Sequence, residues 1–204
     1  MTVHVACVVE GHGEVAALPI LLRRIHQAVA PSTPLHVARP VRVPKTKLVR
    51  PDGLERAVRL AARLCPRPCA LLALLDADDD CPAVLGPQLL ARAEAVLRDI
   101  PTGVVLANRE FEAWFLAGLS SLGGKRGLPQ DVSHVDQPES IRDAKGFLGG
   151  LMDSPRSYSP TADQPAFTAT FDMNAARATS DSFDKCCREV ERLLRSPGKS
   201  LPSG

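Results

Sequence analysis

The chain has 204 residues, 45% of them hydrophobic, and a formal net charge of +2. This length suits one α/β domain of ordinary size or a core domain with a small appendage, and the composition can fill a hydrophobic core. No segment approaches the roughly 20 apolar residues that a membrane helix needs, and the N-terminus lacks the basic start of a signal peptide. We therefore expect a cytoplasmic protein without a membrane partner.

The first 120 residues alternate between predicted strands and helices. An apolar run at 3–9 predicts a strand, and apolar residues at helical spacing predict a helix from 14 to about 28. The second strand is expected at 35–43, where Pro40 favours an edge or bulged strand. A basic loop is expected next, at 44–51.

The same alternation continues to residue 120. The expected elements are a helix from 52 or 53 to 64, a buried strand at 69–75, a helix from 82 to about 98, a strand at 103–107 and a short helix at 113–119. This order predicts a parallel, doubly wound, Rossmann-like sheet of about four strands with helices on both faces.

The composition of the sequence changes after residue 120, where Gly, Pro, Ser and Asp become frequent. Helices are expected near 138–151, 172–178 and 181–195, joined by irregular loops. The predicted organisation is an α/β core at 1–120, a mainly helical extension packed on that core at 121–195, and a disordered tail at 196–204.

Two acidic motifs directly follow predicted buried strands. Glu10 follows the first strand, and the run Asp76-Ala77-Asp78-Asp79-Asp80 follows the strand at 69–75. The carboxyl ends of parallel strands border the crevice where open α/β sheets bind ligands. Carboxylates that converge there repel one another unless a cation or a shared proton intervenes. Because oxygen ligands favour hard cations, the pattern predicts Mg²⁺ or Mn²⁺ acting on a phosphate.

Glu10 precedes the turn Gly11-His12-Gly13, which leads into a predicted helix. It is a candidate general acid or base, or a metal ligand, and the backbone N–H groups of the turn could bind a phosphate at the helix N-terminus. The alternative is that Glu10 only caps the helix. His12 is the one histidine that we consider a site candidate, because it lies in this turn.

Asp76 and Asp78 are the best candidate ligands of one ion, since a single residue separates them. Asp80 is a third candidate, whereas Asp79 is expected to face solvent. The alternative is a loop before a helix, where Asp is tolerated for its turn chemistry. Glu112 follows the fourth strand and could enter the same crevice, or it could lie exposed in the first turn of a helix.

Lys145 is a candidate phosphate contact in the second half of the chain. Together with other basic residues it could form a positive rim around the acidic centre, as suits a polyanion. The alternative for each of these residues is scattered, solvated charge. The other basic residues are Lys45, Lys47, Arg50, Arg109, Lys125, Arg126 and Arg142.

Val9-Glu10-Gly11 after the first strand and Asp76-Ala77-Asp78 after a later one resemble the motifs of the Toprim fold. This fold occurs in topoisomerases, primases and overcoming-lysogenisation-defect nucleases. The resemblance implies that Glu10 is the acid or base of the reaction and that Asp76 and Asp78 are the Mg²⁺ ligands.

The chain is more specifically similar to a small bacterial Toprim-like family of uncharacterised function, the DUF4276 type, which is often encoded beside SMC/ABC-type ATPases. The similar segments are Val-Glu-Gly-x-Gly-Glu at 9–14, Leu-x-Asp-x-Asp-Asp at 74–79, Phe-Glu-Ala-Trp-Phe-Leu at 111–116, a later Lys, Tyr-x-Pro at 158–160 and Ser-x-Ser-Phe at 180–183. The likeness runs from residue 3 to about 195. No ATPase domain is fused here, so any ATP-driven step would need a separate chain.

The first hypothesis is a Mg²⁺-dependent nuclease that acts on nucleic acid with a separate SMC/ABC-type ATPase, in phage defence or DNA repair. Asp80 and Glu112 would then support the same ion or a second one. The second hypothesis is a non-catalytic module that binds nucleic acid or the ATPase and regulates it. The third is a phosphohydrolase of small molecules. A homo-oligomer is compatible with all three.

Overall fold

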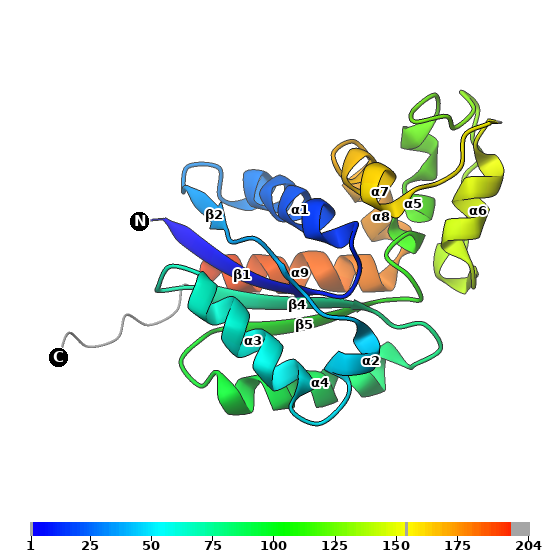
Figure 1. Ribbon diagram of the computed structural model, residues 1–204. Coiled ribbons are helices and arrows are strands. Elements are labelled where there is room, and N and C mark those ends of the chain that lie inside the picture. Colours follow the sequence, from blue (N-terminus) through cyan, green and yellow to red (C-terminus); the bar gives the residue numbers. More distant parts are fainter. Residues whose placement is uncertain (1, 154, 197–204) are drawn as a thin grey trace.

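A computed structural model describes residues 2–153 and 155–196, which form a five-stranded sheet between two layers of helices (Figure 1). The strands are β1 (Val3–Val9), β2 (Leu35–Val37), β3 (Val41–Arg42), β4 (Ala70–Asp76) and β5 (Thr102–Ala107). Their order is β2-β1-β4-β5, β3 also pairs with β1, and all these pairs are parallel. The predicted parallel α/β sheet is confirmed.

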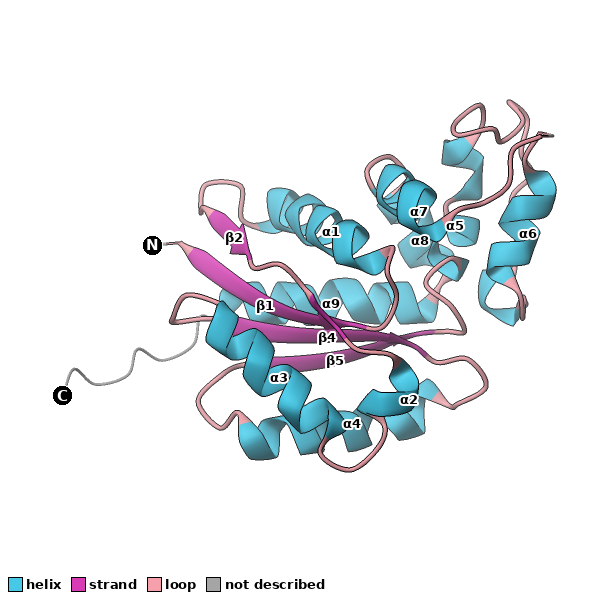
Figure 2. Ribbon diagram, viewed as in Figure 1, coloured by secondary structure: helices cyan, strands magenta, loops and turns pink. Residues whose placement is uncertain are grey.

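Helices cover both faces of the sheet, as predicted. Figure 2 shows α1 and α9 on one face and α3 and α4 on the other. The helices are α1 (Glu14–Val29), α2 (Lys45–Leu48), α3 (Gly53–Leu64), α4 (Pro82–Val96), α5 (Ala113–Ala117), α6 (Ala144–Leu151), α7 (Pro160–Thr168), α8 (Met173–Thr179) and α9 (Asp181–Arg195). Short 3-10 turns lie at Leu119–Leu122 and Pro138–Ser140. None of the described helices is both long and apolar enough to cross a membrane.

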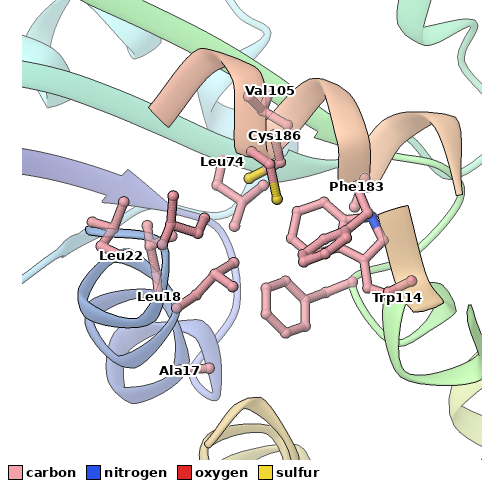
Figure 3. Packing of buried hydrophobic residues seen from close by; sticks show 14 of the residues in the cluster. Ala17, Leu18, Leu22, Leu74, Val105, Trp114, Phe183 and Cys186 are labelled. Carbon is pink, nitrogen blue, oxygen red and sulfur yellow. The ribbon is translucent and has the colours of Figure 1, made fainter. Parts of the chain in front are cut away.

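The C-terminal helix α9 is part of the layer that covers the sheet. Figure 3 shows Phe183 and Cys186 of α9 packed near Leu74 of β4, Leu18 of α1 and Trp114 of α5. These five side chains are fully buried. The segment after residue 120 therefore adds more than an appendage, because its last helix completes the three-layer core.

The sheet has a topological switch point between β1 and β4. From β1 the chain passes through α1 to β2 on one side, whereas from β4 it passes through α4 to β5 on the other side. In such sheets the crevice beyond the carboxyl ends of the two central strands is the usual ligand site. Helices α5, α6, α7 and α8 gather beyond this edge (Figure 1).

Two local predictions need correction in the segment from 35 to 51. The expected strand at 35–43 is broken into β2 and β3, because Pro40 has no N–H to donate to the sheet. The expected basic loop at 44–51 contains the one-turn helix α2. Pro44 begins this turn with a favourable backbone geometry, and Leu48 anchors it in the core.

Helix α7 was not expected, because the segment around it was predicted to be irregular. Pro160 lies in the first turn, where a missing N–H is tolerated, but Pro165 inside the helix hides the helical pattern. The helix expected at 138–151 begins only at Ala144, capped by Asp143, whose carboxylate accepts from the Gly146 N–H at 2.8 Å. The helices expected near 172–178 and 181–195 are confirmed. Residues 197–204 of the expected tail lie outside the described residues.

Candidate functional site

Glu10 and Asp76 meet at the switch point of the sheet. Val9 of β1 lies beside Leu74 of β4, so the residues that follow emerge together. The backbone N–H of Asp76 donates to Glu10 Oε2 at 3.3 Å, and Asp76 Oδ1 accepts from the Phe111 N–H at 2.7 Å. The main chain therefore fixes both carboxylates at the edge where a ligand is expected.

Glu112 brings a third carboxylate to this edge and is fully buried. Its Oε1 accepts hydrogen bonds from the Tyr158 hydroxyl at 2.9 Å and from Gln164 Nε2 at 2.8 Å. Its Oε2 has no hydrogen-bond partner among the described residues. The alternative of an exposed first-turn residue is therefore wrong for Glu112.

Lys145, from the start of α6, points its ammonium group into the carboxylates. Its Nζ lies 3.5 Å from Glu112 Oε2, 3.6 Å from Asp76 Oδ2 and 3.8 Å from Glu110 Oε1. Burial opposes the charged ammonium, but the three carboxylates prevail and raise the pKa of Lys145 above its usual value. Lys145 is thus the internal counter-ion of a group that we call the carboxylate cluster: Glu10, Glu14, Asp76, Glu110 and Glu112.

Glu14 belongs to this cluster although the sequence analysis gave it no role. It is 2% exposed, and its Oε2 accepts from the backbone N–H groups of Glu10 at 3.2 Å and Gly11 at 3.1 Å. Burial, together with the charge of Glu10, raises the pKa of Glu14 to about 7. The signal available in the sequence was its place directly after the Gly-x-Gly turn, where a first-turn Glu can reach back to the preceding N–H groups.

The cluster carries more negative charge than Lys145 neutralises. Burial raises the pKa of Asp76 well above its usual range, and the charge of Glu14 adds to this effect. Burial also raises the pKa values of Glu10 and Glu110. Buried carboxyls of this kind are stabilised by a bound proton or by an added cation.

Asp78 and Asp80 are exposed, unlike the buried Asp76 and Glu112, and both pair with Lys45. Lys45 Nζ lies 2.9 Å from a carboxylate oxygen of each, and both side chains are more than half exposed. The charge of Asp78 nevertheless raises the pKa of Glu10. Glu10, a member of the carboxylate cluster, is therefore close enough to this exposed pair to be affected by the charge of Asp78.

Asp79 faces solvent as predicted, with 79% of its side chain exposed. It pairs with Arg109 at 2.7 Å and with Arg142 at 3.4 Å. Together with Lys45, three of the expected rim cations thus lie beside the acidic loop. Arg126 instead pairs with Asp163 at 2.8 Å, away from this loop.

The turn Gly11-His12-Gly13 has a packing reason for its second glycine. A Cβ atom on Gly13 would collide with the Gln164 side chain and the Pro160 carbonyl of α7. His12 is exposed. The glycine at position 13 is thus explained by the close approach of α7, and phosphate binding by the N–H groups of the turn stays a prediction.

The residues fit a hard cation by donor type and charge. Within 2–153 and 155–196, no three Asp, Glu, His or Cys side chains form a ready-made metal cage. Glu10, Asp76 and Glu112 nevertheless supply carboxylate oxygens, and the unpartnered Glu112 Oε2 faces the ammonium of Lys145. A divalent ion would therefore have to replace or accompany the ammonium as counter-charge.

Comparison with known families gave one match, to a domain of unknown function, DUF4276, over residues 9–191. The chain belongs to the DUF4276 family. No curated protein and no solved structure matched it. The DUF4276 match begins one residue before Glu10, includes Asp76, Glu112 and Lys145, and ends within α9. The whole carboxylate cluster thus lies inside the family domain.

Proposed function

We propose that this DUF4276 protein is a Mg²⁺- or Mn²⁺-dependent phosphoryl-transfer enzyme, a nuclease of the Toprim type. The observation that carries the proposal is the meeting of Glu10, Asp76 and buried Glu112 at the switch point, where Glu112 Oε2 has no hydrogen-bond partner among the described residues and faces only the ammonium of Lys145. Buried carboxylates with raised pKa values at such an edge are typical of catalytic sites.

Each residue of the cluster would have a defined task. A bound divalent ion would polarise the phosphate and lower the pKa of water. Asp76 and Glu112, with Asp78 from the exposed side, would hold it. Glu10, whose pKa is raised by burial, would exchange the proton of the reaction, since a carboxyl group with a pKa nearer neutrality serves both as acid and as base. Lys145 would balance negative charge on the phosphoryl oxygens.

The proposal includes a partner. The likeness to proteins encoded beside SMC/ABC-type ATPases suggests that a separate ATPase gates the site, in phage defence or DNA repair. Lys45 and its partners Asp78 and Asp80 lie at the exposed side of the site and are the place where such gating would act.

A non-catalytic role is the second candidate, and one observation favours it. Lys145 already neutralises part of the cluster, and the described residues hold no preformed metal cage. In that case the domain would bind nucleic acid or the ATPase without turnover. A phosphohydrolase of small molecules would use the same residues and would differ only in its substrate.

The test is nicking of supercoiled plasmid with Mg²⁺ or Mn²⁺, with and without ATP and a separate SMC/ABC-type ATPase. We expect Asp76→Asn and Glu10→Gln to abolish nicking, whereas Asp79→Asn, which removes a carboxylate from the same loop, should retain it. Nicking that survives Asp76→Asn would contradict the nuclease. A wild-type protein that binds the ion but cleaves nucleic acid under none of these conditions would favour the non-catalytic role. If that protein hydrolyses nucleotides, the phosphohydrolase is favoured instead.

A further inference from the structure

The positive charge of the chain is concentrated in one segment. Residues 39–67 carry nine Lys and Arg against two Asp and Glu, a net charge of +7, whereas the whole chain carries +2. The remainder of the chain therefore carries −5. Such an asymmetry creates a local positive potential that the overall charge conceals.

Most of this charge is exposed on α2, α3 and the loops that flank them. On α3, Arg56, Arg59 and Arg63 share the face opposite to the buried Leu54 and Val58. We call the exposed set the basic strip: Lys47, Arg50, Arg56, Arg59, Arg63 and Arg67. Among the described residues, no salt bridge neutralises any member of the basic strip.

Two hollows lie along the basic strip, and cations line both. The first has a volume of about 430 Å³ and lies between β3 and α3; Val41, Val43, Ala57 and Leu60 make its lining mostly apolar, and Lys47, Arg50 and Arg56 complete it. The second, of about 340 Å³, includes Arg59, Arg63 and Arg67 at the other end of α3. The strip therefore offers two successive places where a phosphate chain can contact several cations at once.

The basic strip begins beside the carboxylate cluster. The Val43 N–H donates to the Val9 carbonyl at 2.9 Å, one residue before Glu10. Lys45, on the turn that opens the strip, contacts Asp78 and Asp80. Figure 1 shows α2 near the carboxyl ends of the strands and α3 running back along the sheet from there. A polyanion on the strip would thus extend to the site.

The composition of the segment 39–67 favours contacts to phosphates over contacts to bases. Seven of its nine basic residues are Arg, whose planar guanidinium matches phosphate oxygens in pairs. The segment has no aromatic residue on which a base could stack. Binding by such a surface is independent of sequence and falls steeply with salt, because it releases counter-ions.

We propose that the basic strip binds the sugar-phosphate backbone of nucleic acid without sequence preference and leads it to the carboxylate cluster. The delivery step rests on the proposed nuclease function, whereas binding does not. Leu60 and Leu64, at 48% and 60% exposed, are the only large apolar side chains on the described α3 face that could favour another occupant. They lie one helical turn apart beside Arg59 and Arg63, and the helix lacks the aromatic anchors of helices that lie in a membrane surface.

The test is fluorescence anisotropy with a labelled DNA duplex in EDTA at increasing salt. The strip variant is Arg56→Gln/Arg59→Gln/Arg63→Gln, and the matched control is Arg23→Gln/Arg188→Gln/Arg195→Gln, which removes three exposed arginines elsewhere. We expect the strip variant to bind about tenfold more weakly or worse, with a salt slope smaller by about 2, and the control to change affinity less than about twofold. Equal melting temperatures would show that both variants are folded.

Several outcomes would overturn the proposal: no binding by the wild type at low salt, equal affinity of the strip variant, a strong sequence preference, or tighter binding to anionic lipid vesicles than to DNA. An assay of plasmid nicking distinguishes a failure of the proposed binding surface from a failure of the proposed nuclease function. If the wild type binds DNA through the basic strip but never cleaves it, the proposed binding surface is supported and the proposed nuclease function is contradicted. If the wild type cleaves DNA and the strip variant binds DNA as tightly as the wild type, the binding surface is contradicted and the nuclease function is supported.

Discussion

Glu112 Oε2 lies 3.5 Å from the ammonium of Lys145 and has no hydrogen-bond partner within the described part of the chain, although the other oxygen of the same carboxylate accepts two hydrogen bonds. One half of Glu112 is thus held by Tyr158 and Gln164, and the other half is left to a cation. Lys145 supplies that cation in the present structure. Substitution of Lys145 should therefore expose the repulsion among the carboxylates of the cluster as a loss of stability.

Lys145→Met should destabilise the protein in EDTA, because it leaves Asp76 and Glu112 without their counter-ion. A fully buried pair broken in this way costs about 3–5 kcal/mol, and the partial exposure of Lys145 reduces this to about 1–2 kcal/mol. Mn²⁺ should restore the loss, because it can take the vacated place. Thermal melts with EDTA and with Mn²⁺ measure both effects, and Lys185→Met, an exposed lysine on α9, is the control. A melting temperature equal to that of the wild type in EDTA would contradict this role.

The raised pKa of Glu14 predicts a stability that depends on pH. The pKa lies at about 7 in the folded protein against 4.5 for a free glutamate, so the folded state holds a proton that the unfolded state releases. The stabilisation is complete below about pH 4.5 and is lost as the pH rises to about 7.

Glu14→Gln should therefore flatten this part of the pH profile and raise stability at pH 8 by roughly 1–3 kcal/mol. Denaturant unfolding in EDTA at several pH values measures the difference. Asp76, whose pKa is also raised, keeps some of the slope in the variant. As a control, Glu94→Gln removes an exposed carboxylate of α4 and should leave the pH profile of stability unchanged. If Glu14→Gln keeps the same dependence of stability on pH as the wild type, Glu14 is not the group that causes it.

Tyr158→Phe should destabilise the protein by about 1–2 kcal/mol, because Glu112 loses a hydrogen bond at 2.9 Å to its charged oxygen. The loss should be smaller in a Glu112→Gln background, where the acceptor is neutral. Unfolding of the two single variants and the double variant gives this coupling directly. Equal losses in both backgrounds would show that the Tyr158 hydroxyl does not act through the carboxylate of Glu112.

Ser182→Ala should loosen the join between α9 and the sheet. Ser182 Oγ accepts from Trp114 Nε1 at 2.9 Å and from the Asn108 N–H at 3.1 Å. The substitution leaves two donors unsatisfied, which costs about 2–4 kcal/mol. Urea unfolding measures this loss of stability, and Ser133→Ala, at an exposed serine, is the control. A change below about 0.5 kcal/mol in Ser182→Ala would show that Ser182 does not stabilise the contact of α9 with Trp114 and Asn108.

The fold was largely predictable because its signals are local. The buried run that ends at Asp76 has the length and composition of a strand between two helical layers, and β4 ends there. Ser180 begins α9 by accepting from the Phe183 N–H at 3.1 Å, a local interaction typical of Ser at a helix N-terminus. Pro165 is a counter-example, because tertiary packing holds a helix where propensity argues against one.

The site was predictable only in part, because its contacts join distant segments. The positions of Glu10 and Asp76 follow from the strands that precede them. The approach of Lys145 depends on how α6 packs, and the engagement of Asp78 by Lys45 depends on a helical turn that the sequence did not reveal. That Asp76 and Asp78 bind one ion stays a prediction; in the structure Asp78 has a left-handed backbone, with φ of 52°, and its carboxylate contacts Lys45.

The most direct test of the central claim is calorimetric titration of Mn²⁺ and Mg²⁺ into the wild type, Asp76→Asn and Asp79→Asn. Asp76 lies in the buried cluster and Asp79 faces solvent in the same loop, so the two variants differ in place and not in charge. The account predicts saturable binding to the wild type and to Asp79→Asn, and binding weakened about tenfold or more in Asp76→Asn. Absence of binding to the wild type, or equal affinity in all three proteins, would contradict a cation site in the carboxylate cluster.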